Sequence, residues 1–161
     1  MTYAIVYSSK TGNTRRLAET IRDVLLTESC LYFGAPDDAV LAADRIYVGF
    51  WTDKGTCDAD TAAFLSRLTG QQVFLFGTAG FGGAPEYFDK ILSAAQQHLP
   101  GCVAVCGSYM CQGKMPLAVR TRYEQMEESP RRQLMLDNFD AALSHPDEND
   151  LTCLREAVCM C

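Results

Sequence analysis

The sequence predicts an α/β fold, a three-layer αβα sandwich in which a five-stranded parallel sheet lies between two layers of helices. Five short apolar runs alternate with stretches of helical periodicity, which indicates repeated strand–helix–strand units. The run 45–50 is apolar almost throughout, as is typical of a strand buried on both faces of a parallel sheet. Because right-handed crossovers join parallel strands, we expect helices on both faces of the sheet.

Each element can be placed from its own pattern. The strands are expected at residues 3–7, 30–33, 45–50, 73–76 and 102–106. The helices are expected at residues 13–28, 37–43, from 58 onward and at 85–99, followed by a last helical region that is broken near Ser129-Pro130. Leu136, Phe139 and Leu143 lie on the expected core face of that region. These elements form one domain, residues 1–145, and leave residues 146–161 as a C-terminal tail that is either disordered or an extra helix.

Composition narrows the possible partners. The net charge of −6 and the isoelectric point of about 4.8 argue against nucleic acid and anionic membranes, and they suit a monomer that docks on a basic surface of another protein. No run approaches the ~20 apolar residues of a membrane span, and the first strand begins too soon after Met1 for a signal peptide. We therefore expect a cytoplasmic protein.

The eight cysteines do not indicate a disulfide framework, because that interpretation applies to small domains without a core. We expect reduced thiols, as in a reducing or anaerobic cytoplasm. Cys102, Cys106 and Cys111 surround a strand, where burial as small apolar side chains is expected. No C-x-x-C pair occurs, and the terminal cysteines have only a weak C-x5-C-x-C spacing, so no metal site is predicted. The two histidines belong to no catalytic Cys-His-Asp arrangement.

The segment 8–14 joins the first strand to the first helix and has the residue types of an anion-binding loop. A helix that begins near Asn13 directs its unpaired backbone N–H groups, and the positive end of its dipole, into this turn. Hydroxyl and amide side chains surround the same point, and Gly12 lets the backbone approach an anion closely. We interpret the segment as a phosphate site; the alternative is an ordinary strand–helix turn with an Asn or Thr cap.

Two further loops leave the same edge of the predicted sheet, where ligands bind in open α/β folds. Residues 50–58 contain the only tryptophan, Trp51, and residues 77–85 place four glycines around Phe81. A large aromatic side chain in each of two exposed loops favours a flat ligand, because aromatic stacking adds about 0.5–1.5 kcal/mol beyond the buried area. The alternatives are a core position for Trp51, a simple loop anchor for Phe81 and an ordinary turn glycine at Gly55.

The segment Ser9-Lys10-Thr11-Gly12-Asn13-Thr14 resembles the phosphate loop of flavodoxins, whose usual form is Thr/Ser-x-Thr-Gly-Asn-Thr. Residues 77–82 resemble the second flavin loop of that family, with Phe81 in the place of its usual aromatic residue, whereas residues 50–58 match the first flavin loop less closely. The resemblance spans about residues 2–144 and is to the short-chain type, because no long insertion splits the fifth strand. It implies the strand order 2-1-3-4-5, with FMN bound at the switch point between strands one and three.

The resemblance also implies which residues hold the cofactor. The expected FMN-binding positions belong to the three loops and are Ser8, Ser9, Lys10, Thr11, Gly12, Asn13, Thr14, Phe50, Trp51, Thr52, Asp53, Lys54, Gly55, Thr78, Ala79, Gly80, Phe81, Gly82 and Gly83. The pair Lys54-Gly55 stands where short-chain flavodoxins carry a peptide that flips on reduction of the flavin. We expect Gly55, which is free to adopt a positive φ, to support that flip.

Four carboxylates, those of Asp53, Asp58, Asp60 and Glu86, lie on or beside the flavin loops. A carboxylate ~10 Å from the ring would oppose the negative charge of a reduced flavin by about 1.7 kcal/mol at an effective dielectric of ~20. Several such groups would lower the second reduction potential, whereas Lys54 acts in the opposite direction. The alternative for each is an ordinary solvated loop charge.

The resemblance implies an FMN-binding electron carrier that shuttles electrons from a reductase to an acceptor enzyme, with no catalytic residue of its own. A second class is an FMN-dependent reductase of a small molecule, for which Tyr109, Met110, Lys114 and Met115 would form a rim; a plain crossover loop is the alternative there. A third class is an accessory electron-donating subunit of a larger flavin reductase, because the chain also resembles the flavodoxin-like companions of bilirubin reductases from gut anaerobes.

Overall fold

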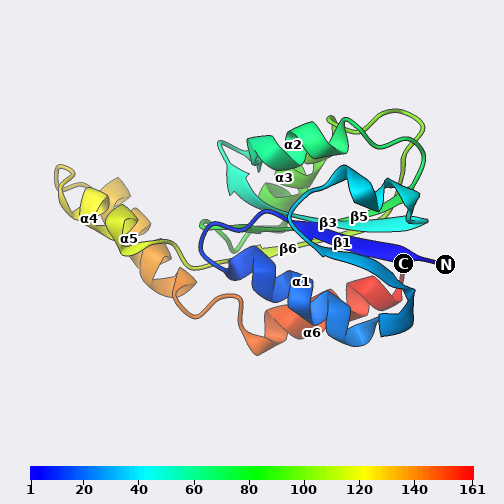
Figure 1. Ribbon diagram of the computed structural model, residues 1–161. Helices are drawn as coiled ribbons and strands as arrows, with labels where there is room; N and C mark the ends of the chain where they lie inside the picture. The colour runs from blue at the N-terminus through cyan, green and yellow to red at the C-terminus, as the bar shows by residue number, and fades with distance from the viewer.

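The computed structural model describes residues 1–161 and places a parallel sheet between two layers of helices (Figure 1). The strands are β1 (Tyr3–Tyr7), β2 (Cys30–Gly34), β3 (Arg45–Asp53), β5 (Gln72–Ala79) and β6 (Ala104–Gln112). They lie in the order β2-β1-β3-β5-β6, which confirms the predicted order 2-1-3-4-5. A short extra strand, β4 (Thr56–Cys57), pairs antiparallel with the end of β3.

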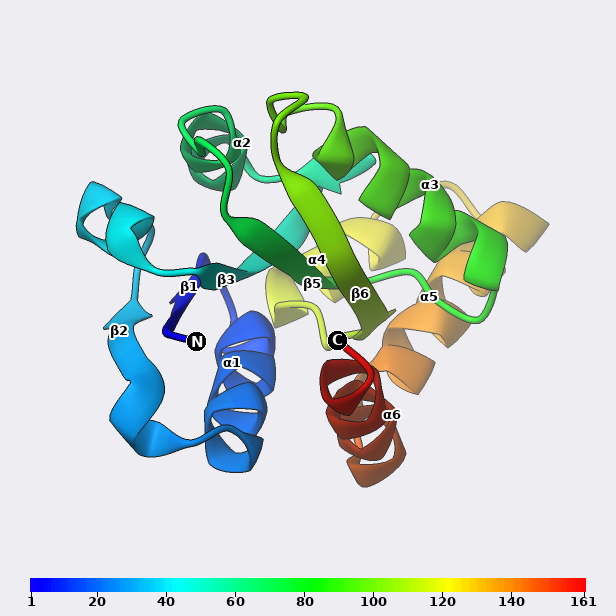
Figure 2. The same ribbon diagram turned by 90° about the vertical axis from the view of Figure 1, so that its right-hand side faces the viewer.

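Helices cover both faces of the sheet (Figure 1 and Figure 2). Helix α1 (Asn13–Val24) and helix α6 (Glu148–Cys159) lie on one face, and α2 (Ala59–Leu65) and α3 (Pro85–Gln96) lie on the other. Two short 3₁₀ helices flank β2, namely η1 (Thr27–Ser29) and η2 (Asp38–Ala42). Helix α1 is shorter than the predicted 13–28, because the backbone becomes extended at Leu25. No helix has both the length and the apolar character that crossing a membrane requires.

The sheet separates two apolar cores. Val48 and Leu75 point into the core under α2 and α3, whereas their sequence neighbours Tyr47 and Phe74 point into the core under α1 and α6. Successive side chains of a strand point to opposite faces, so a strand buried on both sides is apolar throughout. This double burial explains the continuous apolar runs of the sequence. Because β1, β3 and β5 are parallel, the loops that follow them leave the same edge of the sheet.

Helices α4 (Leu117–Glu124) and α5 (Pro130–Ala142) form a hairpin that projects beyond the sheet instead of packing on it (Figure 1). The hairpin has a small core of its own, made by Tyr123, Leu136 and Phe139. The sequence predicts that Leu143 lies on the core face of this region. That prediction is wrong, because the apolar faces of α4 and α5 pack on each other and leave Leu143 50% exposed.

The helix that completes the layer beside α1 is α6, which lies in the segment predicted as a tail. Leu151, Leu154 and Val158 recur at helical spacing and are buried against α1 and the sheet. A capping box starts the helix: the Asp147 carboxylate accepts the N–H of Asp150 at 2.9 Å, and the Asp150 carboxylate accepts the N–H of Asp147 at 2.9 Å. Of the two alternatives for residues 146–161, the structure has the helix.

Strand β6 is longer than the predicted strand 102–106, since its pairing with β5 continues to Gln112. Residues 107–112, predicted as a loop, are therefore part of the sheet. Helix α6 returns the chain end to this strand, where Cys161 forms a disulfide with Cys106 at a Cα–Cα distance of 5.6 Å. The prediction of reduced thiols is wrong for this pair, because α6 places the last residue beside β6. Cys111 is buried as predicted, whereas Cys102 is exposed.

Candidate functional site

The loops that follow β1, β3 and β5 converge at the carboxyl edge of the sheet and enclose a cavity of about 460 Å³, here called the cleft. The predicted positions that line the cleft are Lys10, Thr11, Asn13, Thr14, Trp51, Thr52, Lys54, Gly55, Thr78, Ala79, Gly80 and Phe81. The three loops that the sequence singles out therefore meet in one place.

The first loop keeps a row of free backbone donors at the N-terminus of α1. The N–H groups of residues 9–14 find no acceptor within the chain, whereas the N–H of Arg15 reaches Ser9 Oγ at 3.3 Å and that of Arg16 reaches the Gly12 carbonyl oxygen at 3.0 Å. Free N–H groups at the positive end of a helix dipole form the arrangement that binds phosphate groups. The loop can therefore hold an anion without breaking a hydrogen bond of the protein.

Side chains of the first loop tie it to the other parts of the cleft. The buried Thr14 hydroxyl donates to the carbonyl oxygen of Phe50 at 3.1 Å and lies 3.2 Å from Thr78 Oγ1. Asn13 Nδ2 donates to the carbonyl oxygen of Lys114 at 2.8 Å. Because buried polar groups with satisfied hydrogen bonds rigidify their surroundings, these bonds hold the three loops and the chain after β6 in one geometry.

The second loop, which follows β3, contains a tight hairpin turn. Lys54 and Gly55 are its two central residues, enclosed by the pair of Asp53 with Thr56, and their φ angles are 51° and 82°. A two-residue hairpin turn with positive φ at both positions favours glycine, which explains Gly55. The Thr52 hydroxyl fixes the base of the turn by donating to the carbonyl oxygen of Thr78 at 2.8 Å.

Both aromatic side chains that the sequence associates with a flat ligand line the cleft. Trp51 is half-buried, and the Lys10 ammonium lies 5.0 Å from the centre of its ring in a cation–π contact. Phe81 is 41% exposed. Trp51 lies near the end of β3 and Phe81 lies in the loop after β5, and both rings are available for stacking.

A further wall of the cleft comes mainly from the chain after β6, which sequence reasoning largely missed. Its lining residues are Tyr87, Gly113, Lys114, Met115, Pro116, Val119 and Arg122. Of the predicted rim residues, Lys114 and Met115 belong to this wall, whereas Tyr109 and Met110 lie within β6 and outside the lining. Helical periodicity predicts a helix here but does not show that α4 turns toward the cleft, because that placement depends on tertiary contacts.

The remaining predicted positions lie outside the cleft lining. Ser8, Ser9 and Gly12 line a neighbouring cavity of about 500 Å³, together with Arg15. Phe50 is fully buried in the core beneath α2 and α3. Phe50 lines neither cavity, and the same is true of Asp53, Gly82 and Gly83.

The charged side chains that line the cleft are all cationic: Lys10, Lys54, Lys114 and Arg122. The carboxylates predicted around a flavin are absent from this lining, namely Asp53, Asp58, Asp60 and Glu86. Asp58, for example, is buried as the cap of α2 and accepts the N–H of Thr61 at 3.2 Å. The charged groups that line the cleft itself are therefore cations, and an effect of these carboxylates on the flavin from outside the lining stays a prediction.

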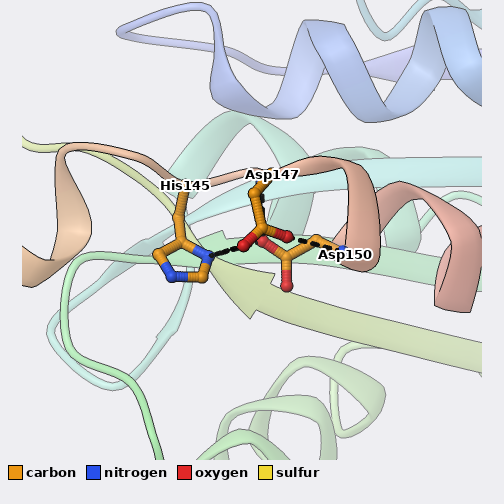
Figure 3. Close-up of side chains that lie close together, drawn as sticks. All are labelled: His145, Asp147 and Asp150. Carbon is orange, nitrogen blue, oxygen red and sulfur yellow. Dashed lines mark hydrogen bonds and ion pairs between the residues drawn. The ribbon is translucent and has the colours of Figure 1, made fainter.

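A histidine and two aspartates meet at the start of α6 (Figure 3). His145 Nδ1 lies 2.6 Å from Asp150 Oδ2 and 3.8 Å from Asp147 Oδ2. Both carboxylates also accept backbone N–H groups in the capping box, and the bond from the Asp150 N–H holds the pKa of the Asp147 carboxyl below its usual range. These contacts explain the cluster as the cap of α6.

Two titratable residues of β6, the half-buried Tyr109 and the buried Cys111, lie outside the cleft lining. Burial raises the pKa of the Cys111 thiol and of the Tyr109 hydroxyl well above their usual values. Tyr109 donates to the carbonyl oxygen of Asp150 at 2.7 Å and so ties β6 to α6. Because the thiolate is the reactive form of cysteine, Cys111 is a core residue and not a nucleophile.

Known proteins share this sequence pattern along nearly the whole chain. Residues 4–159 match the family model described as a flavodoxin domain. The chain is 44% identical over 172 residues to the flavodoxin-like domain-containing protein BilS of Clostridium symbiosum (strain WAL-14163), a match that covers 94% of this chain and 90% of the relative.

Solved structures share the fold at low sequence identity. Oxidised flavodoxin 2 from Bacillus cereus superposes with a TM-score of 0.57 at 15% identity, covering 99% of this chain and 97% of the other. A flavoprotein in complex with FMN from Lactobacillus acidophilus NCFM gives a TM-score of 0.53 at 15% identity and covers 68% of this chain and 92% of the other. The family match includes α6 as well as the three loops of the cleft, and the chain therefore belongs to the flavodoxin-domain family.

Proposed function

We propose that the chain binds FMN in the cleft and acts as an electron-transfer protein between a reductase and an acceptor enzyme. The observation that carries this proposal is the convergence of free N–H groups of the first loop, those of residues 10, 11, 13 and 14, with Trp51 and Phe81 on one cavity. A flavoprotein of the same fold is known in complex with FMN. Family membership supports the same cofactor.

The lining residues fit the parts of FMN. The N–H groups and hydroxyls of the first loop suit the phosphate, and no carboxylate in the cleft lining opposes its charge. Trp51 and Phe81 suit the faces of the isoalloxazine ring. The volume of about 460 Å³ lies within the range of roughly 300–1,000 Å³ that is usual for one small ligand.

FMN supplies the redox chemistry when it is bound, and the chain's own residues bind, orient and shield it. The cleft lining contains no histidine, cysteine or carboxylate that could act as a general base or nucleophile.

For the acceptor we propose a larger flavin reductase, which the chain would serve as an accessory electron donor. The support is the sequence resemblance to flavodoxin-like companions of bilirubin reductases. The chain is also 44% identical to the flavodoxin-like domain-containing protein BilS.

A second candidate function is the reduction of a small molecule by the chain itself. The observation that favours it is the additional wall of the cleft, in which Met115, Val119 and Arg122 could contact a substrate beside the flavin. This function requires that the isolated chain accept electrons from a nicotinamide or another small donor.

The test begins with the purified chain loaded with FMN and reduced without oxygen. The carrier proposal predicts rapid reoxidation by an acceptor protein, followed by visible absorbance, and no sustained oxidation of NADH or NADPH by the chain alone. Sustained NAD(P)H oxidation in the presence of a quinone would contradict the carrier and favour the reductase. Failure to bind FMN would contradict both functions.

A further inference from the structure

The mouth of the cleft is cationic on a protein whose overall charge is negative. Lys10, Lys54, Lys114 and Arg122 supply every charge in the cleft lining, whereas the whole chain carries −6. From this reversal we infer that the mouth is a docking surface for an acidic face of a partner protein. The inference rests on the proposed function, because the docked partner would be the one that exchanges electrons with the cofactor. It departs from the basic partner that the net charge predicts.

The cations of the mouth are free to meet an external anion. All four are exposed, and none of them forms an ion pair within the chain. The Lys10 ammonium makes a cation–π contact with the ring of Trp51 and has no carboxylate partner. Elsewhere on the hairpin, by contrast, Arg120 lies 2.8 Å from the Asp140 carboxylate and is neutralised within the protein.

A bound cofactor does not cancel this charge. The phosphate of FMN would contribute about −2, against the four cations that line the cleft. Lys54 and Arg122 come from the second loop and from α4, so they do not belong to the loop proposed to hold the phosphate. The mouth therefore stays net positive when the cleft is filled.

The shape of this region favours a protein over a small anion. A volume of about 460 Å³ lies within the range of single-ligand pockets, roughly 300–1,000 Å³, so the cleft itself suits one ligand, which is FMN in the proposed function. The hairpin that contributes Val119 and Arg122 to the lining projects beyond the sheet (Figure 1). Leu117 is 72% exposed next to the lining residue Pro116, and Phe81 is also exposed. Exposed apolar side chains beside charged ones are the mixture that protein interfaces use.

The cationic surface is held in place before any partner arrives. Asn138 of α5 and Gln112 of β6 both donate to the carbonyl oxygen of Gly80 at 3.0 Å, so the hairpin that carries Arg122 is tied to the loop that carries Phe81. A preorganised surface loses less conformational freedom on binding.

The test uses one probe protein in two charge states. Cytochrome c is basic, and its succinylated derivative carries carboxylates in place of its lysine ammonium groups. Binding of the full-length chain to each form is measured at about 0.1 M ionic strength, where the Debye length of about 10 Å lets the probe sense the mouth more than the far side of the molecule. The proposal predicts tighter binding to the succinylated form.

Two variants with the same change in net charge localise the effect. Arg122→Glu reverses a charge at the mouth, whereas the matched control Arg131→Glu changes an exposed arginine of the same hairpin that lies outside the cleft lining and has no ion pair. Arg122→Glu should weaken binding of the succinylated probe about three- to tenfold. Arg131→Glu should leave it within about twofold.

Tighter binding of unmodified cytochrome c would overturn the proposal. Equal losses of affinity for the succinylated probe in the two variants would overturn it as well. A third outcome is that the succinylated protein does not bind, whereas hexacyanoferrate(III) binds to the wild type and not to Arg122→Glu. In that case the mouth is a small-anion site and protein docking is refuted. The binding measurement needs no flavin. FMN binding by the chain is titrated separately. A failure to bind FMN would count against the proposed function but would not change the result of the docking measurement.

Discussion

The side-chain amide of Asn138 donates a hydrogen bond to the carbonyl oxygen of Gly80 at 3.0 Å. Asn138 lies on α5, and Gly80 lies at the start of the loop that carries Phe81. Gln112 completes the junction by donating to Gly80 at 3.0 Å and to Asn138 Oδ1 at 3.0 Å. These bonds join a hairpin that has its own small core to the wall of the cleft.

Removing this junction should loosen the cleft. We predict that Asn138→Ala raises the dissociation constant for FMN about two- to tenfold, because one hydrogen bond contributes about 0.5–1.5 kcal/mol. Amide hydrogen exchange at residues 80–83 should become faster in the same variant. The matched control is Asn149→Ala, whose exposed side chain makes no hydrogen bond within the chain. Equal effects of the two substitutions would show that the junction does not support the cleft.

Gly113 is predicted to be essential for the shape of the first loop. A Cβ atom at this position would lie 2.5 Å from Asn13 Nδ2, so Gly113→Ala must displace the side chain that binds the Lys114 carbonyl oxygen. We expect FMN affinity to fall by about tenfold or more, as for a lost buried hydrogen bond with added strain. Gly101→Ala is the control, because a Cβ there meets nothing within 4 Å. An unchanged affinity in Gly113→Ala would contradict this account of the loop.

Replacing Gly55 measures the cost of its backbone conformation alone, because an added Cβ atom would make no steric contact. Its φ is 82° and a Cβ would meet nothing within 4 Å, so Gly55→Ala should cost about 1–2 kcal/mol through the backbone alone. Urea denaturation of the flavin-free chain measures this cost. The same variant tests the proposed peptide flip: one-electron potentials of bound FMN should shift, and unchanged potentials would refute a role for Gly55 in the flip.

Helix α6 should behave as a core element. Leu154 is fully buried against the sheet, so Leu154→Ala should lower the free energy of unfolding by about 2–5 kcal/mol. Leu143→Ala, at a half-exposed position after α5, should change it by no more than about 0.5 kcal/mol. Chemical denaturation compares the two, and the reverse ranking would mean that α5, and not α6, covers the sheet.

The cap of α6 should weaken in acid. The pKa of Asp147 is held below its ordinary value of 3.8, chiefly by the N–H of Asp150. A carboxyl with a lowered folded-state pKa contributes stability that is present above the unfolded pKa and is lost as pH falls through the folded one. The stability difference between wild type and Asp147→Asn should therefore shrink below about pH 4. A constant difference for Asp147→Asn across this pH range would contradict the assignment.

The sheet and the first loop were predictable because local sequence determines them. Strands buried on both faces are apolar throughout, and a strand that runs into Gly12-Asn13-Thr14 before an amphipathic helix has few other interpretations. The aromatic loops with Trp51 and Phe81 follow from the rule that ligands bind at the carboxyl edge of such sheets.

The region after β6 was not predictable from periodicity. Both α5 and α6 carry apolar side chains at helical spacing, such as Leu136 and Leu154, and the pattern does not say which helix packs on the sheet and which pairs with α4. The contribution of Arg122 to the cleft was missed for a similar reason. Asp58 is adjacent to the second loop in sequence, but its side chain turns away to cap α2, whereas Arg122 reaches the cleft from a distant helix.

The most direct test of the account uses the single tryptophan. Trp51 lines the cleft, so its fluorescence reports on the site without a label. Titration of FMN into the flavin-free chain should quench Trp51 emission to saturation at equimolar FMN, and the yellow cofactor should co-elute with the protein on gel filtration. Unchanged Trp51 emission together with no retained FMN would contradict the central claim that the cleft is a flavin site.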